Sequence, residues 1–309
     1  MSRGTVLILH TVMTNYWWEI EVNCEPALEE ITFWRLEQLG CRGTVSEQKA
    51  QCYQVRAYLP QHQADPQDFY LLSHAILGDA LELGLQPPAI RWQLIEEEEW
   101  ATSWKENWQP MEVGGLFLIY PAWLEPPTEM GDRFLLRLDP GMAFGTGDHP
   151  TTQLCLEGLA THYPNPIGKL ADIGCGSGIL GIGAWLLGAS QIYGVDTDPL
   201  AVHAARLNRD LNRIPQDQFM IETGSIEQLL EWSHPPFDGI CCNILAEVVN
   251  GLIPNFQRLC HPHTWAILSG ILVSQSQSVM DQLDRHGWVV TDSWIQGEWC
   301  CLNARRNLP

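Results

Sequence analysis

The sequence predicts an α/β protein built from two domains, and three observations support this prediction. A chain of 309 residues with 45% hydrophobic side chains is longer than one core usually needs. Over residues 1–98, short strands of alternating apolar and polar side chains are interspersed with helical patterns. From residue 170 onward, nearly continuous apolar strands alternate with helices, which is typical of a parallel sheet covered by helices on both faces.

The N-terminal domain is predicted to span residues 1–98 in the element order βαββαβ. Trp18, Ile20 and Val22 share one face of its first strand. The other elements are a helix from Pro26 to Gly40 and then segments 44–47, 52–59, 68–83 and 90–95. This order predicts a small ferredoxin-like α+β sheet with both helices on one face. Because the domain lacks clustered histidines, cysteines or paired carboxylates, we expect it to recognise a substrate; the alternative is a purely structural role.

Residues 99–130 are predicted to form a tryptophan-rich linker. Trp100, Trp104 and Trp108 recur every four residues, so they share one face of a helix. Such a stripe more often packs against neighbouring domains than stacks on a substrate. We therefore expect a connector between the two domains.

The third segment, residues 131–309, is predicted to hold the larger sheet. Its strands are expected at residues 170–173, 191–195, 219–222, 239–242, 265–268, 288–294 and 299–304. The last two strands flank a short turn, so we expect a hairpin that adds an antiparallel edge to an otherwise parallel sheet. Seven strands in this pattern predict a Rossmann-like α/β domain.

A glycine-rich segment, Asp172–Gly178, follows the first of these strands and predicts a cofactor site. Gly174 and Gly176 would let the backbone approach a nucleotide-like ligand without a Cβ in the way. The glycines also fit a dinucleotide pattern, with Asp196 twenty residues after Gly176, so they leave NAD open. Asp172 favours S-adenosylmethionine, because its carboxylate would repel a pyrophosphate and attract a sulfonium and an ammonium. Alternatively, Asp172 holds the loop through backbone N–H groups.

Further candidate ligands follow the next strands. Asp196 is expected to accept hydrogen bonds from ribose hydroxyls, whereas Asp198 precedes a proline and is predicted to be a helix N-cap. Near Thr223 and Gly224 only a backbone contact with the adenine is expected, since a capping role explains Ser225. The amide oxygen of Asn243 could accept a hydrogen bond from an amine substrate or from the ammonium of the cofactor, without adding a charge that would hold the amine protonated. The alternative for Asn243 is a turn-forming asparagine.

Residues 139–152 are too rich in glycine and polar side chains for an ordinary connector, and we expect a lid over the cofactor. Phe144 offers an apolar plane for the cofactor, and Thr146 lies on the same loop. Asp148 or His149 can cap the helix that begins at residue 150. We favour this capping or core role of His149 over a catalytic one.

The charge balance limits the partners of the chain. Its 17 basic and 37 acidic side chains give a formal charge of −20, which disfavours nucleic acid and favours a basic partner. The apolar runs are too short for a membrane span, and the 10 cysteines show no metal or redox spacing. We therefore expect a cytoplasmic protein with reduced thiols, without a metal or a membrane partner. Its oligomeric state is open, with a monomer as the default.

In their order along the chain, five motifs resemble the family of methyltransferases that modify large-subunit ribosomal protein L11 (PrmA). They are DPGMAFGTGDHPTT (139–152), ADIGCGSGILGIGA (171–184), GVDTDPLAV (194–202), CNILA (242–246) and LSGIL (268–272). Each motif is weak alone, but the ordered set is specific, and the resemblance extends over essentially the whole chain. Asp148 departs from the threonine expected after GTG, which affects only the contacts of that loop.

The resemblance implies a class I methyltransferase domain that uses S-adenosylmethionine, preceded by a module that binds the ribosomal protein. It implies methylation of lysine side chains and of an N-terminal amine. Cofactor contacts would come from Thr152, Gly174, Asp196 and Asn243, and only Thr152 is new relative to the reasoning from single residues.

We expect in-line attack of a neutral amine on the sulfonium methyl, so that alignment matters more than a strong base. Asn243 is the residue expected to orient the amine, with Phe144 and Thr146 on the closing loop. The alternatives are a methyltransferase acting on another protein, on RNA or on a small molecule, an NAD-dependent oxidoreductase, and a catalytically dead binding module.

Overall fold

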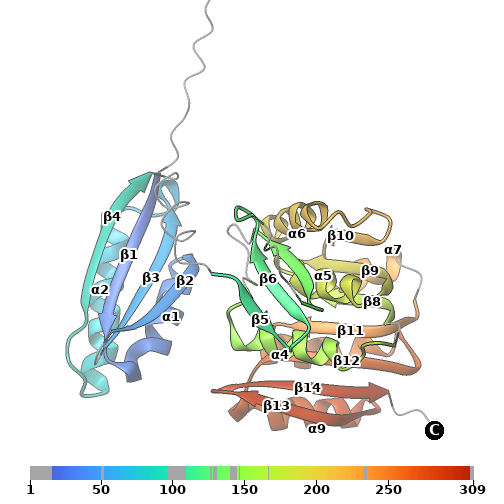
Figure 1. Cartoon of the computed structure of the whole chain (residues 1–309). Coiled ribbons are helices and arrows are strands. Elements are labelled where there is room, and N and C mark those ends of the chain that lie inside the picture. The colour runs from blue at the N-terminus through green and yellow to red at the C-terminus, as the bar shows by residue number, and fades with distance from the viewer. Residues whose placement is uncertain are drawn as a thin grey trace, which may run out of the picture. The chain divides into compact units, whose positions relative to one another are not determined.

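The computed structural model describes residues 16–49, 52–96, 109–125, 127, 131–139, 145, 147–165, 167–232 and 235–306. The chain divides into two compact units, Met1–Trp108 and Gln109–Pro309 (Figure 1). Each unit has a hydrophobic core of its own. The predicted two-part α/β organisation is thus present, and we describe each unit by itself.

The described residues of the first unit form a four-stranded antiparallel sheet with two α-helices. Its elements are β1 (Tyr16–Cys24), η1 (Pro26–Leu28), α1 (Glu29–Gln38), β2 (Arg42–Lys49), β3 (Cys52–Pro60), η2 (Gln61–Gln63), α2 (Pro66–Glu82) and β4 (Ala89–Glu96). The strand order β2-β3-β1-β4 is that of the ferredoxin-like plan, so the predicted order βαββαβ is confirmed. Ile20 and Val22 alternate with polar neighbours on β1 and share the core with Phe69 and Ile76 of α2.

The second unit is centred on a seven-stranded sheet. Its strands are β8 (Gly168–Ile173), β9 (Ala189–Asp196), β10 (Phe219–Thr223), β11 (Phe237–Asn243), β12 (Cys260–Leu272), β13 (Trp288–Gln296) and β14 (Trp299–Arg306). The order is β10-β9-β8-β11-β12-β14-β13, and β14 is antiparallel to both of its neighbours. The predicted hairpin is therefore present, with β14 inserted between β12 and β13. This is the sheet of the class I Rossmann-like fold that the sequence predicts.

Helices cover both faces of this sheet (Figure 1). They are α4 (Pro150–Ala160), α5 (Ile179–Leu186), α6 (Pro199–Leu211), α7 (Ile226–Trp232), α8 (Ala246–Phe256) and α9 (Ser276–Arg285), with a short η3 (Val273–Gln275). Helices α7, α8 and α9 share a buried cluster with Ala266 and Leu268 of β12. Ile267 lies between Ala266 and Leu268 on β12, and its side chain is on the other face of the sheet, where it contacts Gly158 of α4. Alternate strand residues are thus buried on opposite faces, which explains the continuous apolar runs.

A smaller sheet in the second unit differs from the predicted domain boundary. Strands β5 (Met111–Val113), β6 (Phe117–Pro121) and β7 (Phe134–Leu138) pair in the order β5-β6-β7. Two of these strands lie inside residues 99–130, which the sequence predicts to be linker. Every residue of Phe117–Pro121 is buried, so this segment belongs to the packed second unit. The tryptophan stripe at residues 100, 104 and 108 lies outside the described residues.

In the described part of the chain, no helix combines the length and the apolarity needed to cross a membrane. The ten cysteines are unpaired thiols, and most of them are buried. Burial raises the pKa of Cys41 to about 12 and that of Cys260 to about 12, although the charge of Arg306 opposes the shift at Cys260.

Candidate active site

The glycine-rich loop lies between β8 and α5, where the predicted strand and helix meet. Gly174, Gly176 and Gly178 have φ values of 72°, 52° and 81°, in the left-handed region that favours glycine. A Cβ on Gly174 would lie 2.3 Å from the Cγ2 methyl of Ile244. The loop is therefore tightly packed at Gly174, and it lies at the carboxyl end of β8, the end at which open parallel sheets bind ligands.

Asp172 lies at the base of this loop and is completely buried. Its Oδ2 accepts a hydrogen bond from the Gly181 N–H at 3.0 Å, while its Oδ1 has no hydrogen-bond partner among the described residues. Burial raises the pKa of this carboxyl to about 7; the Gly181 N–H opposes the shift and the charge of Asp196 adds to it. Asp172 thus holds the first turn of α5, which follows the loop, and its Oδ1 has no hydrogen-bond partner among the described residues.

Asp196 and Asp198 have the different environments that their spacing predicts. Asp196 ends β9, and its two oxygens accept hydrogen bonds at 2.9 Å from the N–H groups of Gly176 and Asp198. Each oxygen keeps a second lone pair, and the side chain is only partly buried, so it can still accept hydroxyl groups. Asp198 caps α6 by accepting a hydrogen bond from the Leu200 N–H at 2.9 Å. The predicted N-cap is confirmed.

Asn243 ends β11, next to the glycine loop in the sheet. Its Nδ2 donates to the hydroxyl of Thr152 at 3.4 Å, a long hydrogen bond. Its Oδ1 is buried and has no hydrogen-bond partner among the described residues. Thr152 is fully buried in the first turn of α4. The structure thus brings together two residues 91 positions apart, and the buried Oδ1 can accept a further hydrogen bond.

His149 is the N-cap of α4, as the sequence predicts. Its Nδ1 accepts a hydrogen bond from the Thr151 N–H at 3.3 Å and contacts the Thr151 hydroxyl at 2.7 Å. The ring also lies edge-on against Trp299, with centroids 4.9 Å apart. Burial lowers the pKa of His149, against the opposing charge of Asp148. The Nδ1 atom of His149 is therefore engaged in capping α4, which is a structural role.

Two buried residues that sequence reasoning missed anchor the segment before α4. Ser177 Oγ donates to the carbonyl of Gly145 at 2.7 Å. Asn208 Nδ2 donates to the carbonyl of Ser177 at 2.9 Å, and its Oδ1 accepts from the N–H of Asp139 at 2.8 Å. The start of the predicted lid segment is therefore tied to α6 through Asp139, and its middle is tied to the glycine loop through Gly145. The predicted lid residues Phe144 and Thr146 lie outside the described residues.

At the end of β10, the backbone is hydrogen-bonded to the tip of β9 that carries Asp196. The N–H of Gly224 donates to the carbonyl of Asp196 at 2.9 Å. Gly224 has a φ of 150°, and a Cβ there would lie 2.6 Å from Cβ of Gln228. Thr223 is exposed. This geometry is compatible with the backbone contact that the sequence predicts here.

The donors and acceptors at the site suit a cationic, nucleoside-like ligand. Buried Oδ1 atoms of Asp172 and Asn243 lack hydrogen-bond partners among the described residues, and such atoms are costly unless a donor reaches them. The Asp196 carboxylate stands at the tip of the next strand. The loop glycines Gly174 and Gly176 follow Asp172, and the N–H of Gly176 donates to Asp196. An ammonium, a sulfonium and two hydroxyls match this set in charge and in hydrogen bonding.

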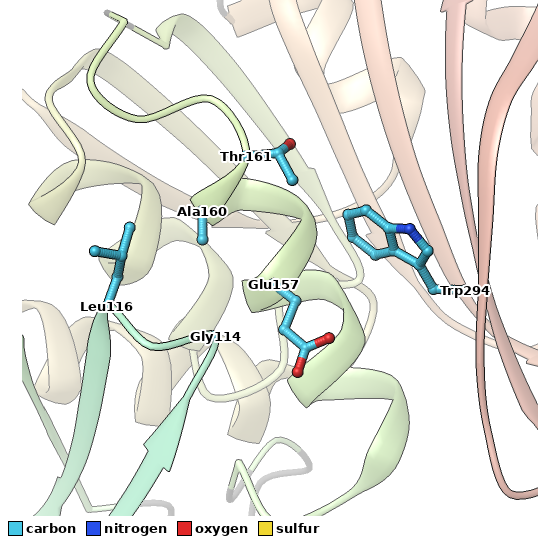
Figure 2. Close-up of a pocket in the computed structure, with 6 residues that line it drawn as sticks. All are labelled: Gly114, Leu116, Glu157, Ala160, Thr161 and Trp294. Atoms are coloured by element: carbon cyan, nitrogen blue, oxygen red, sulfur yellow. The ribbon is translucent and has the colours of Figure 1, made fainter.

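A separate hollow of about 400 Å³ lies beside α4 (Figure 2). It is lined by Gly114, Leu116, Glu157, Ala160, Thr161 and Trp294. None of the predicted site residues lines it. The candidate active site is therefore defined by its unpaired acceptors and glycine backbone rather than by this hollow.

Comparisons with known proteins agree on one family. The model of the family "Ribosomal protein L11 methyltransferase (PrmA)" matches residues 16–307. A ribosomal protein L11 methyltransferase of Cyanothece sp. is 51% identical over 299 residues, which cover 95% of this chain and 100% of the relative. Another, of Synechococcus elongatus, is 51% identical over 290 residues, covering 93% of this chain and 96% of the relative.

A solved structure shares the fold. The crystal structure of a ribosomal protein L11 methylase from Lactobacillus delbrueckii subsp. bulgaricus has a TM-score of 0.59 and 31% sequence identity. The match covers 65% of this chain and 100% of that chain.

Proposed function

Because this chain belongs to the ribosomal protein L11 methyltransferase (PrmA) family, we infer that it is an S-adenosylmethionine-dependent enzyme that methylates ribosomal protein L11. The observation in its own structure that carries this function is the pair of unpaired acceptor oxygens of Asp172 and Asn243, on neighbouring strands of the sheet. The Asp172 oxygen suits the cationic cofactor, and the Asn243 oxygen suits an amine.

We propose roles for the residues that would hold S-adenosylmethionine. Asp196 accepts hydrogen bonds from the ribose hydroxyls, and Gly174 and Gly176 let the backbone approach the cofactor. Asp172 contributes the field of its carboxylate, and its free Oδ1 accepts a hydrogen bond directly or through water. Thr152 holds the Asn243 amide in place through its hydroxyl. Phe144 and Thr146 remain proposed cofactor contacts from the lid segment.

We propose that Asn243 is the catalytic residue and that it orients the acceptor amine. When bound, S-adenosylmethionine supplies a methyl group already activated by a positive sulfur, so the enzyme must chiefly align a neutral amine and exclude water. The neutral amide oxygen accepts an N–H from the amine without favouring its protonated form, as a carboxylate would. The amine can lose its proton to solvent before it enters. Lysine side chains and an N-terminal amine are the acceptors that we propose.

The first unit is proposed to recognise the ribosomal protein. It has its own core and carries none of the proposed cofactor residues. The net charge of −20 would steer a basic protein substrate toward the enzyme and disfavour direct contact with RNA. We also propose that the enzyme acts in the cytoplasm, where its unpaired cysteines would stay reduced.

The role of Asn243 can be tested with labelled S-adenosylmethionine and ribosomal protein L11. Asn243→Ala is expected to lower kcat by about 100-fold, because the amine loses its orienting acceptor. Asn250→Ala, on α8, is the matched control and should keep kcat within about twofold. Near-normal turnover of Asn243→Ala would remove Asn243 from the mechanism, and label on RNA alone would overturn the proposed substrate.

A further inference from the structure

Ile244, the residue after Asn243, lies between two glycines that come from different parts of the sheet. Gly174 belongs to the cofactor loop after β8, and Gly270 lies within β12. For both glycines, the nearest atoms that an added Cβ would meet belong to Ile244. The half-buried Ile244 side chain also packs against the core cluster shared with α8. This single residue thus contacts the cofactor loop, the strand β12 and the hydrophobic core.

Gly270 meets the backbone of Ile244. A Cβ at Gly270 would lie 2.3 Å from the carbonyl oxygen, 2.6 Å from the carbonyl carbon and 2.9 Å from the nitrogen of Ile244. Gly270 also has a φ of 78°, and the pairing of β12 with β14 shifts register between Leu268 and Ile271. The N–H of Ile244 donates to the carbonyl of Ser269 at 3.2 Å. The irregular part of β12 therefore packs directly against the backbone of Ile244, the residue that follows Asn243.

Gly174 meets the side chain of Ile244. A Cβ at Gly174 would lie 2.3 Å from the Cγ2 methyl but 3.8 Å from Cβ of Ile244. The contact therefore depends on one methyl group, which valine shares with isoleucine and alanine lacks. The cofactor loop at this point can come no closer to the Asn243 segment than the Cγ2 methyl allows.

We propose that Ile244 is a positioning residue that fixes the spacing between the cofactor loop and the Asn243 amide. The backbone of Ile244 packs against Gly270, and its Cγ2 methyl packs against Gly174. A shift of the cofactor loop therefore moves the segment after β11 that carries Asn243, and the reverse. This inference rests on the proposed function, because the distance that matters is the one between the methyl donor and the amine. A misplacement of about 1 Å can cost roughly 100-fold in the rate of a transfer reaction.

The first test measures packing in the chain without any ligand. Gly174→Ala is expected to lower the Tm more than Gly188→Ala does, because Gly188 has a comparable φ of 91° but open space around it. Ile244→Ala removes the Cγ2 methyl, so Gly174→Ala should lower the Tm much less in an Ile244→Ala background than in the unsubstituted chain, which is the recovery expected from a double-mutant cycle. Gly270→Ala should not be recovered by Ile244→Ala, since its contact is with backbone atoms. Recovery of neither glycine variant, or of both, would contradict the proposed contacts.

The second test separates positioning from mere stability by kinetics. Ile244→Val keeps the Cγ2 methyl and should keep kcat on ribosomal protein L11 within about threefold. Ile244→Ala should lower kcat by about 30-fold or more while KM for the ribosomal protein changes less than about threefold. The Kd of S-adenosylmethionine, measured by calorimetry, should change more in Gly174→Ala than in Gly270→Ala, because only Gly174 belongs to the cofactor loop.

The outcomes distinguish this inference from the proposed function. If the unsubstituted chain transfers no label to ribosomal protein L11, the proposed function fails, and the Tm comparison still decides whether Ile244 couples the two glycines. If the unsubstituted chain is active and Ile244→Ala has the same kcat as Ile244→Val, the positioning role is wrong while the function stands.

Discussion

Asp172 is held in an environment that opposes its charge. The carboxyl is fully buried, and the thiols of Cys175, Cys241 and Cys242 are close enough for its charge to raise their pKa further beyond the effect of burial. Its single described hydrogen bond comes from the Gly181 N–H. A buried carboxylate with so few donors is costly, and a cationic ligand would offset part of that cost.

The pH dependence of stability should report this cost. The pKa of Asp172 is about 7 in the folded chain, against an ordinary value of 3.8. Between these two pH values Asp172 keeps its proton in the folded state but has lost it in the unfolded state. The stability that the protonated Asp172 contributes is therefore fully present below pH 3.8 and is lost as the pH rises to about 7. Asp172→Asn removes the titration and should stabilise the unliganded protein, relative to the unsubstituted chain, by up to about 4 kcal/mol at pH 8.

Urea unfolding of Asp172→Asn and of the unsubstituted chain between pH 4 and pH 8 would measure the difference in their free energies of unfolding. The two free energies of unfolding should diverge as the pH rises. Curves that stay parallel would show that Asp172 titrates in the folded protein as it does in an unfolded chain.

At the scale of residues, sequence reasoning reached the groups that lie next to recognisable local signals. Asp198 precedes a proline, His149 precedes a helix, and both are caps in the structure. Ser177 and Asn208 carry no such signal, because their hydrogen bonds join segments about 30 residues apart. Such partners become visible only when the fold has brought the segments together.

At the scale of elements, the tip of β9 carries a helix cap and a proposed cofactor ligand two residues apart. Asp198 accepts a hydrogen bond from the first turn of α6, whereas Asp196 lies beside the glycine loop. Substitution should separate the capping role of Asp198 from the role that we propose for Asp196.

Asp198→Ala should cost about 1 kcal/mol of stability, the usual effect of losing an N-cap, and should leave the Kd of S-adenosylmethionine within about twofold. Asp196→Asn should instead weaken binding of the cofactor by about 10-fold or more, since ribose hydroxyls lose a charged acceptor. Calorimetric titration and thermal unfolding of the two variants would check this. If both variants weaken binding equally, the division of roles is wrong.

Elements with strong apolar periodicity were predictable, and isolated short ones were not. The seven strands of the large sheet lie where their apolar runs predict them. Strands β5, β6 and β7 were all missed, because they lie outside the regular alternation of strand and helix that predicts the large sheet. Their assignment depends on pairing with one another, which the sequence does not state.

At the scale of the whole molecule, the two units have separate cores, and this separation should be measurable. Phe69 is fully buried in the first unit and packs edge-on against Trp18, with ring centroids 5.0 Å apart. Phe69→Ala should destabilise that unit by about 3–5 kcal/mol. The proposed cofactor residues all belong to the second unit.

We therefore expect Phe69→Ala to keep the Kd of S-adenosylmethionine within about twofold while it raises KM for ribosomal protein L11 severalfold. Calorimetry and steady-state kinetics on the full chain would measure the two effects. A parallel loss of cofactor binding would show that the units depend on each other for stability.

The position of β14 also bears on how the chain folds as it is made. In synthesis, β13 is complete before β14 exists, yet β14 is the strand that joins β13 to β12. Until β14 emerges, β12 exposes an unpaired edge that another growing chain could pair with. The large sheet thus closes from within, by insertion of the last of its seven strands, and the edge of β12 stays open to pairing with another chain until that strand is in place.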